Sequence, residues 1–111
     1  MALALDPKRG DAHLNLGKLY HDAHDLTKAE AHYRAAVESD PEDPAPRFNI
    51  GVLMEDLKRP QDAMLAYREA VKLDPSFADA HYNLGLLFDS LGKKAEAVAH
   101  LRAARKIYLR E

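Results

Sequence analysis

The chain has 111 residues, of which 47% are hydrophobic, so it is long enough to bury the core of one domain. Its 16 lysines and arginines nearly balance 18 aspartates and glutamates, and a net charge of −2 creates no overall field that would recruit nucleic acid or an anionic membrane. The absence of cysteine excludes disulfides, thiolate metal sites and cysteine nucleophiles. The sequence shows no signal-peptide pattern and no apolar run that could cross a bilayer, and although it specifies no compartment, our default expectation is the cytoplasm.

Glycines recur in this chain with a period of 34 residues, at Gly17, Gly51 and Gly85, and alanines follow in the same step. A fixed period of this size is typical of a stacked array of helical units, which presents an extended surface and seldom carries chemistry. Residues 1–9 precede three full units, which span 10–43, 44–77 and 78–111.

Each unit predicts two helices joined by a short turn. In the first unit, apolar residues recur at helical spacing around Leu16 and Leu19, and again, after a polar break, around Ala29 and Tyr33. The same spacing recurs in the other two units, and we expect no strand. The predicted helices are 11–23, 27–39, 45–57, 61–73, 79–91 and 95–109.

Residues at the predicted helix ends agree with these bounds. Pro41 and Pro75 close the second helices, because proline disfavours a helical conformation in the residue before it. Thr27 and Glu30 have the spacing of a capping box, and Gly92 is suited to a helix end.

Small residues explain how two helices can pair closely. A glycine or alanine at a crossing point lets two backbones approach, so we expect contacts between the first and second helix of each unit. The expected pairs are Gly17 with Ala29, Gly51 with Ala63, and Gly85 with Ala97.

These features make the chain resemble the tetratricopeptide repeat family, and the wording of its repeats is similar to bacterial arrays. The family pattern has Leu-Gly in the first helix, a large residue three positions later, and alanines in the second helix. The resemblance covers nearly the whole chain and implies an all-α, right-handed superhelical solenoid of three helix-turn-helix repeats. The first-helix matches are Leu16-Gly17 with Tyr20, Ile50-Gly51 with Met54, and Leu84-Gly85 with Phe88.

The chain departs from the family pattern at two places. His13, Arg47 and His81 stand where the family usually has tryptophan, and we expect the two histidines to pack between helices rather than to act as catalysts. Leu109 stands where the third proline would be, so the last helix is expected to run on toward the chain end.

The same 34-residue register predicts what lies at each end of the array. Pro7 lies 34 residues before Pro41, which predicts that residues 1–9 are the remnant of a preceding repeat in a longer protein. At the other end, Arg105 replaces the valines found at this position in the first two units. A charged outer face is typical of a terminal repeat, although Ile107–Leu109 remains apolar and is expected to fold back, dimerise or meet a missing neighbour.

The resemblance implies a concave groove lined by the first helix of each unit, and the groove positions form two rows. One row repeats asparagine, which offers a donor and an acceptor at fixed spacing for the backbone of an extended peptide. The second row changes from aliphatic to aromatic. Three hydrogen bonds give roughly 2 to 4 kcal/mol, whereas micromolar binding needs about 8, so apolar contacts must supply the rest. The alternative is that the asparagines only order the groove. The candidate peptide-binding residues are Asn15, Asn49, Asn83, Leu14, Phe48, Tyr82, Lys18, Val52 and Leu86.

One well-known family site is not predicted here. The carboxylate clamp of co-chaperone repeats grips acidic C-termini through two lysines, two asparagines and an arginine, and only Asn49 matches it. The five positions hold Leu14, Lys18, Asn49, Asp79 and Asn83. Four acidic residues also line the groove, which favours a neutral or basic peptide. They are Asp22, Glu55, Asp56 and Asp89.

Other groups of residues give little support for a metal, nucleic-acid or catalytic site. His21 and His24 lie three residues apart with aspartates beside them, a spacing that can hold a divalent metal, but a solvated helix end is the preferred interpretation. The basic residues of the last helix lack the interleaved aromatic residues of a nucleic-acid surface. Since there is also no glycine-rich phosphate loop and no nucleophile with a base at usable spacing, we expect no enzyme, no cofactor and no bound metal.

The sequence therefore predicts a protein–protein interaction module that binds an extended peptide and acts as an adaptor or scaffold. Two alternatives remain open. One is a self-association module that forms homo-oligomers, and the other is the regulatory region of a larger bacterial protein.

Overall fold

The computed structural model of the chain describes residues 9–110, which form six helices and no strand. Every helix boundary lies within two residues of its predicted position. The expected remnant of a preceding repeat lies outside the described residues, apart from Arg9, where the first helix begins. The helices are α1 (Arg9–Asp22), α2 (Leu26–Ser39), α3 (Pro44–Asp56), α4 (Pro60–Leu73), α5 (Ala78–Ser90) and α6 (Lys94–Tyr108).

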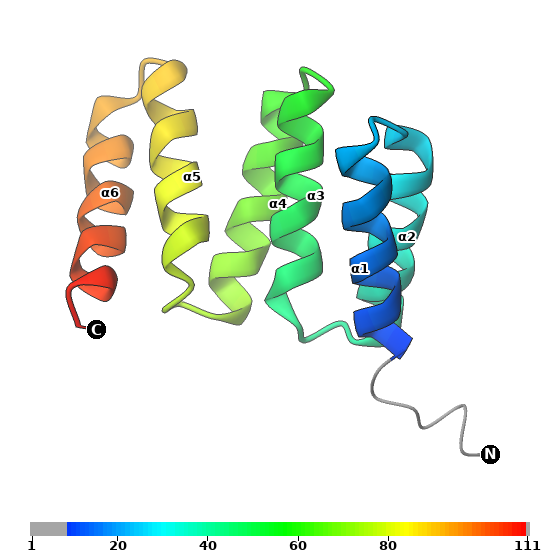
Figure 1. Ribbon diagram of the computed structural model, residues 1–111. Helices are drawn as coiled ribbons and strands as arrows, with labels where there is room; N and C mark the ends of the chain where they lie inside the picture. Colours follow the sequence, from blue (N-terminus) through cyan, green and yellow to red (C-terminus); the bar gives the residue numbers. More distant parts are fainter. Residues whose placement is uncertain (1–8, 111) are drawn as a thin grey trace.

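Consecutive helices pair into repeats, and the repeats stack in a row (Figure 1). The closest packing is within the pairs α1–α2, α3–α4 and α5–α6, while α2 packs on α3 and α4 packs on α5. The first helices also approach one another, since α1 contacts α3. This confirms the predicted all-α helical repeat, with α1–α2 and α5–α6 at opposite ends (Figure 1).

The glycine in the first helix of each repeat accommodates a large side chain, not the small one we expected. A methyl group added to Gly17 would lie 2.5 Å from the ring of Tyr33, and one added to Gly85 would lie 2.7 Å from Leu101. Ala29 is fully buried, but the nearest side chain to Gly17 is the tyrosine four residues further along α2. The nearest partner of each glycine is therefore tyrosine or leucine, not alanine, although in the third repeat the Ala97 carbonyl oxygen would also lie 3.2 Å from the methyl group added to Gly85.

The turn within each repeat has one residue in the left-handed region, at the same repeat position each time. The φ angles are 64° at His24, 62° at Lys58 and 78° at Gly92. The next N–H then donates to a carbonyl five residues back, which closes the first helix in the usual way. Gly92 therefore stands at a helix end, as predicted, and the other two repeats adopt the same turn without glycine.

The predicted capping box at Thr27 and Glu30 is wrong. Helix α2 begins at Leu26, so Thr27 already lies inside it, and Asp25 accepts the hydrogen bond from the backbone N–H of Lys28 at 3.2 Å. The Glu30 carboxylate instead pairs with Arg34 one turn later, at 2.8 Å. The cap lies two residues earlier than expected, which moves the whole box out of register.

Helix α6 ends at Tyr108, one residue before the predicted end, and its last turn is tied to α5. The hydroxyl of Tyr108 donates to the carboxylate of Asp79. Ile107 is half-buried, whereas Leu109 is 71% exposed. The apolar segment at this end is thus folded against the array through its tyrosine. None of the helices formed by residues 9–110 has the length and apolar character needed to cross a membrane.

Candidate functional site

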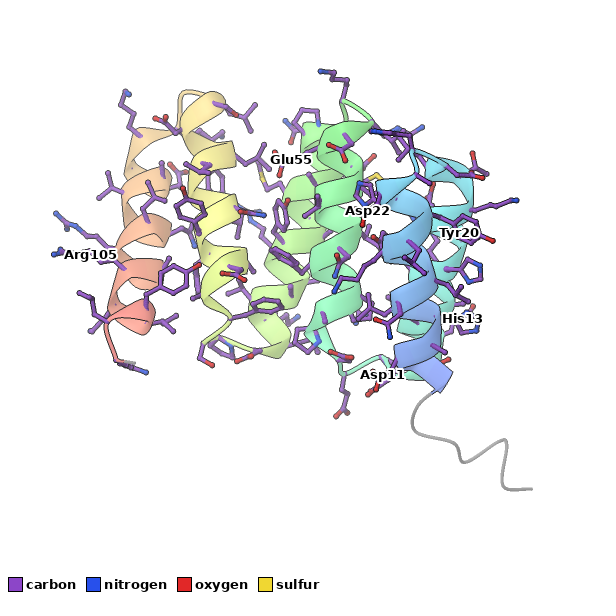
Figure 2. All side chains as sticks on the ribbon, in the orientation of Figure 1. Asp11, His13, Tyr20, Asp22, Glu55 and Arg105 are labelled. Atoms are coloured by element: carbon purple, nitrogen blue, oxygen red, sulfur yellow. The ribbon has the colours of Figure 1, made fainter. Side chains whose placement is uncertain are left out.

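Two adjoining hollows run along the first helices of the three repeats. One, of about 500 Å³, lies between α1 and α3, and the other, of about 250 Å³, lies between α3 and α5. Val52 and Asp56 line both, so the hollows form one groove. Asp22 and Glu55 line one hollow each, and Figure 2 shows both toward the upper ends of the helices, on neighbouring repeats.

The structure brings five of the nine predicted site residues to this groove and leaves four outside its lining. Lining residues are Lys18, Asn49, Val52, Asn83 and Leu86. Leu14 and Phe48 pack against the core, and the Phe48 ring lies 5.1 Å from that of Phe77 and 5.7 Å from that of Tyr67. Asn15 and Tyr82 are exposed.

The three asparagines are identical in sequence but differ in their surroundings. Asn15 is exposed. The amide nitrogen of Asn49 donates to the Ala45 carbonyl of its own helix at 2.9 Å, and that of Asn83 donates to the Tyr67 hydroxyl at 3.3 Å. Asn49 and Asn83 therefore each offer a ligand one remaining N–H and one carbonyl oxygen, and they are held in place before any ligand arrives.

Tyrosine hydroxyls form the polar floor of the groove, which the sequence did not reveal. Tyr67 of α4 is fully buried beneath the hollow between α3 and α5, and its hydroxyl donates to the Glu55 carboxylate at 2.5 Å. Burial and the Glu55 carboxylate raise the pKa of Tyr67 above its ordinary value, because both disfavour a phenolate. The signal for it in the sequence is a tyrosine twelve residues after a groove acid, Glu55.

His21 links the first two repeats across the groove. Its Nε2 lies 2.5 Å from the Asp56 carboxylate on α3, and its Nδ1 lies 3.1 Å from the Tyr33 hydroxyl on α2. The expectation of a solvated helix end is therefore wrong for His21, which is half-buried and paired. Burial, Asp22 and Asp56 together raise the pKa of Tyr33 to about 12.

The groove is acidic where the first helices end. Asp22, Glu55 and Asp56 line it, against Lys18 and the paired His21. The C-terminal ends of α1 and α3 add negative partial charge at the same place. Within residues 9–110, no group of three or more histidine, aspartate or glutamate side chains is arranged to hold a metal ion. The local field thus favours a cationic group of a ligand over an anionic one.

Family models show what this chain is similar to in sequence. Two family models described as tetratricopeptide repeat match residues 2–44 and residues 78–109, and a third, described as TPR repeat, matches residues 59–92. The chain belongs to the tetratricopeptide repeat family. No curated protein sequence matches this repeat protein.

Solved structures of repeat proteins share its fold at low sequence identity. MamA superposes with a TM-score of 0.86 at 20% identity over 96% of this chain, which spans 62% of the MamA chain. The second TPR of Spaghetti, bound to the HSP90 peptide SRMEEVD, gives a TM-score of 0.87 at 16% identity, covering 96% of this chain and 99% of that one. The first TPR of Spaghetti, bound to the same peptide, gives 0.87 at 21%, with coverages of 96% and 84%. These similarities establish the fold of the repeat array.

The Tyr67→Phe variant tests the hydroxyl network. At neutral pH, its free energy of unfolding should fall by about 1 kcal/mol, the usual worth of one hydrogen bond. Because the folded-state pKa lies above the ordinary 10.0, the hydroxyl's contribution is complete below about pH 10 and is lost as the pH rises further. Above pH 10, the variant should therefore lose stability less steeply than the wild type in urea denaturation.

Tyr20→Phe is the matched control, because the Tyr20 hydroxyl makes no hydrogen bond within the described part of the chain. It should leave the alkaline slope unchanged. Equal slopes for Tyr67→Phe and the wild type would show that the hydroxyl is not part of the network.

Proposed function

We propose that the chain is a protein-interaction module that binds an extended peptide segment along α1, α3 and α5, as an adaptor or scaffold. The observation that carries this proposal is the pair of adjoining hollows, which share Val52 and Asp56 as lining residues. Side chains from all three repeats line them. A continuous groove with repeated lining suits a ligand that is itself extended and repetitive. The proposal assigns the groove no catalytic step.

Apolar and polar groups alternate along this groove. Leu86 is 46% exposed and Val52 is half-buried, so both can lose further area to a ligand. Asn49 lines the first hollow and Asn83 lines the second, and each amide keeps one N–H and a carbonyl oxygen for a ligand. We infer that the amides hold the peptide backbone while apolar side chains of the peptide cover Val52 and Leu86.

The charge of the groove favours a neutral or basic segment. The two Spaghetti structures are described as bound to an acidic peptide, SRMEEVD. In this chain, Leu14 packs against the core, and the carboxylate of Asp79, a clamp position, accepts from Tyr108. We therefore infer that the same fold here selects a ligand of the opposite charge.

Paired peptides test this preference. The chain should bind a version of SRMEEVD in which both glutamates and the final aspartate are lysine at least about tenfold more tightly than SRMEEVD itself, a difference of about 1.4 kcal/mol. Fluorescence anisotropy with labelled peptides at low salt measures both. The preference should shrink at high salt, because exposed charges are screened.

The double variant Asp22→Asn with Asp56→Asn should reduce the peptide preference at least threefold. Asp11→Asn with Glu42→Gln removes the same charge from exposed positions outside the groove and should leave it intact; Figure 2 shows Asp11 at the opposite end of α1 from Asp22. Equal or tighter binding of SRMEEVD by the wild type would overturn the proposed charge selection.

Self-association is a second candidate function, favoured by the exposed apolar face of α1. Leu16 is 41% exposed and Leu19 is 65% exposed. The equivalent residues of the next two repeats are buried under the second helix of the preceding repeat. Their exposed fractions are 8% at Ile50, 0% at Leu53, 0% at Leu84 and 5% at Leu87.

A second copy could cover this face with its last helix. Val98 on α6 is 46% exposed, whereas its equivalent on α4, Met64, is 8% exposed beneath α5. Stacking α6 of one molecule on α1 of another would repeat the contact that α2 makes with α3, and would join copies head to tail. Either module could operate inside a larger bacterial protein as its regulatory region.

Sedimentation equilibrium distinguishes the two candidates. If self-association operates, the wild type should form oligomers at high protein concentration, and Leu19→Glu should keep the chain monomeric. Leu65→Glu, at a position that is 59% exposed on α4, serves as the control and should not dissociate the oligomers. A wild type that stays monomeric at millimolar concentration rules out this second function.

A further inference from the structure

The first and third repeats each seat a flat ring between their two helices. In the first repeat, the His32 imidazole lies on the Tyr20 ring, with centroids 5.4 Å apart and planes 9° apart, and its Nδ1 is 3.1 Å from Nδ1 of His13. Figure 2 shows His13 and Tyr20 one above the other on the α1–α2 pair. These three positions form a stack that recurs two repeats later, at His81, Phe88 and His100.

In the third repeat, the His100 imidazole stacks on Phe88 at 5.6 Å and 12°, and its Nδ1 is 3.1 Å from that of His81. Burial, His81 and Arg68 lower the pKa of His100, so a neutral ring occupies this place. The Arg68 guanidinium also lies over the Phe88 ring, at 5.5 Å from its centroid. An uncharged flat ring is thus what the fold accommodates here.

The middle repeat lacks all three members of the stack. Ala66 stands where the seated histidines are, Met54 stands where the aromatic ring is, and Arg47 replaces the second histidine. All three residues line a hollow of about 500 Å³, which lies between α2, α3 and α4 and is separate from the peptide groove. We call this hollow the ring slot and define it by Arg47, Met54 and Ala66.

The walls of the ring slot suit an aromatic ligand. Met54 supplies a polarisable thioether, and Val37 and Ile50 supply aliphatic contacts. The Arg47 guanidinium is held by Glu69 at 3.2 Å and by the Pro41 carbonyl at 2.5 Å, so a planar cationic group is already oriented. Leu65, at 59% exposed, lies on the same lining and remains open to a partner.

We propose that the ring slot is a second binding site, which takes an aromatic side chain from a partner protein. In the first and third repeats, a histidine fills the position that Ala66 leaves open in the middle repeat. An aromatic ring from a partner protein would occupy this space as the histidines do in the other two repeats. The charges around the slot are mixed, with Arg34 and Arg59 against Glu38 and Asp62, so the shape of the ring, rather than its charge, decides what binds. This site lies on the side of the second helices and does not depend on the proposed peptide groove.

The probe is N-acetyl-phenylalanine amide, added to the whole chain, with the Met54 ε-methyl signal as reporter. A ring seated in the slot should move this signal upfield, with half-saturation at roughly 1 to 10 mM, as expected for one small side chain. Met64, which lies outside the ring-slot lining, should not move. N-acetyl-leucine amide, which has no ring, should shift Met54 at least fivefold less.

Ala66→His fills the slot from within and should abolish the Met54 shift. Two other repeats carry histidine at this position, so the variant should fold; should its circular dichroism show lost helix, Ala66→Leu gives the same test. Ala99→His makes the same substitution at an exposed position of α6 and should leave binding unchanged. The proposal is overturned if Met54 does not move by 20 mM, if the leucine probe moves it equally, or if the filled variant responds like the wild type.

Discussion

A tyrosine ring lying on a glycine sets the distance between the two helices of the first and second repeats. Any side chain at Gly51 would enter the space of the Tyr67 ring, so the ring lies directly on the backbone of α3. This contact buries the body of the tyrosine completely and directs its hydroxyl toward the groove. There the Tyr67 hydroxyl donates to Glu55 of the same repeat and accepts from Asn83 of the next repeat. The packing of the second repeat therefore positions polar groups of both repeats.

The third repeat shows what the tyrosine contributes. Leu101 takes the ring's place against Gly85, so the helices still pair closely, but no residue of α6 lines either hollow of the groove in the described part of the chain. The fold of a repeat therefore requires only a bulky side chain against the glycine. Whether that side chain also brings a hydroxyl to the groove can vary from one repeat to the next. The same logic applies at the ring slot, where the middle repeat keeps the fold although Ala66 leaves the space of a histidine open.

The fold was predictable because its signals are local and occur three times. Helix spacing, prolines at helix ends and a fixed period located all six helices within two residues. The errors arose where a shift of one or two residues matters, as at Asp25, which caps α2 in place of Thr27. A cap depends on where the backbone leaves the helix, and residue types alone do not fix that point.

The candidate site was predictable only in part, because equivalent positions do not have equivalent surroundings. The register placed Asn49 and Asn83 in one row, but only the structure shows that one bonds to its own helix and the other to Tyr67. Phe48 follows the same register, yet it packs beside Phe77, which follows α4 in the chain. Contacts between repeats, such as that of His21 with Asp56, join residues 35 apart, and no periodic pattern encodes them.

The free energy of unfolding of Gly51→Ala tests most directly whether this glycine–tyrosine contact organises the array. In an open helix, the change should stabilise by up to about 1 kcal/mol. Here the added methyl group must displace the Tyr67 ring, so we expect a net loss of about 1 to 2 kcal/mol, with a shifted Asn83 side-chain amide signal. Gly10→Ala, whose methyl group would meet nothing closer than 3.4 Å, should not be destabilised. A Gly51→Ala variant as stable as the wild type, with an unmoved Asn83 signal, would contradict the account.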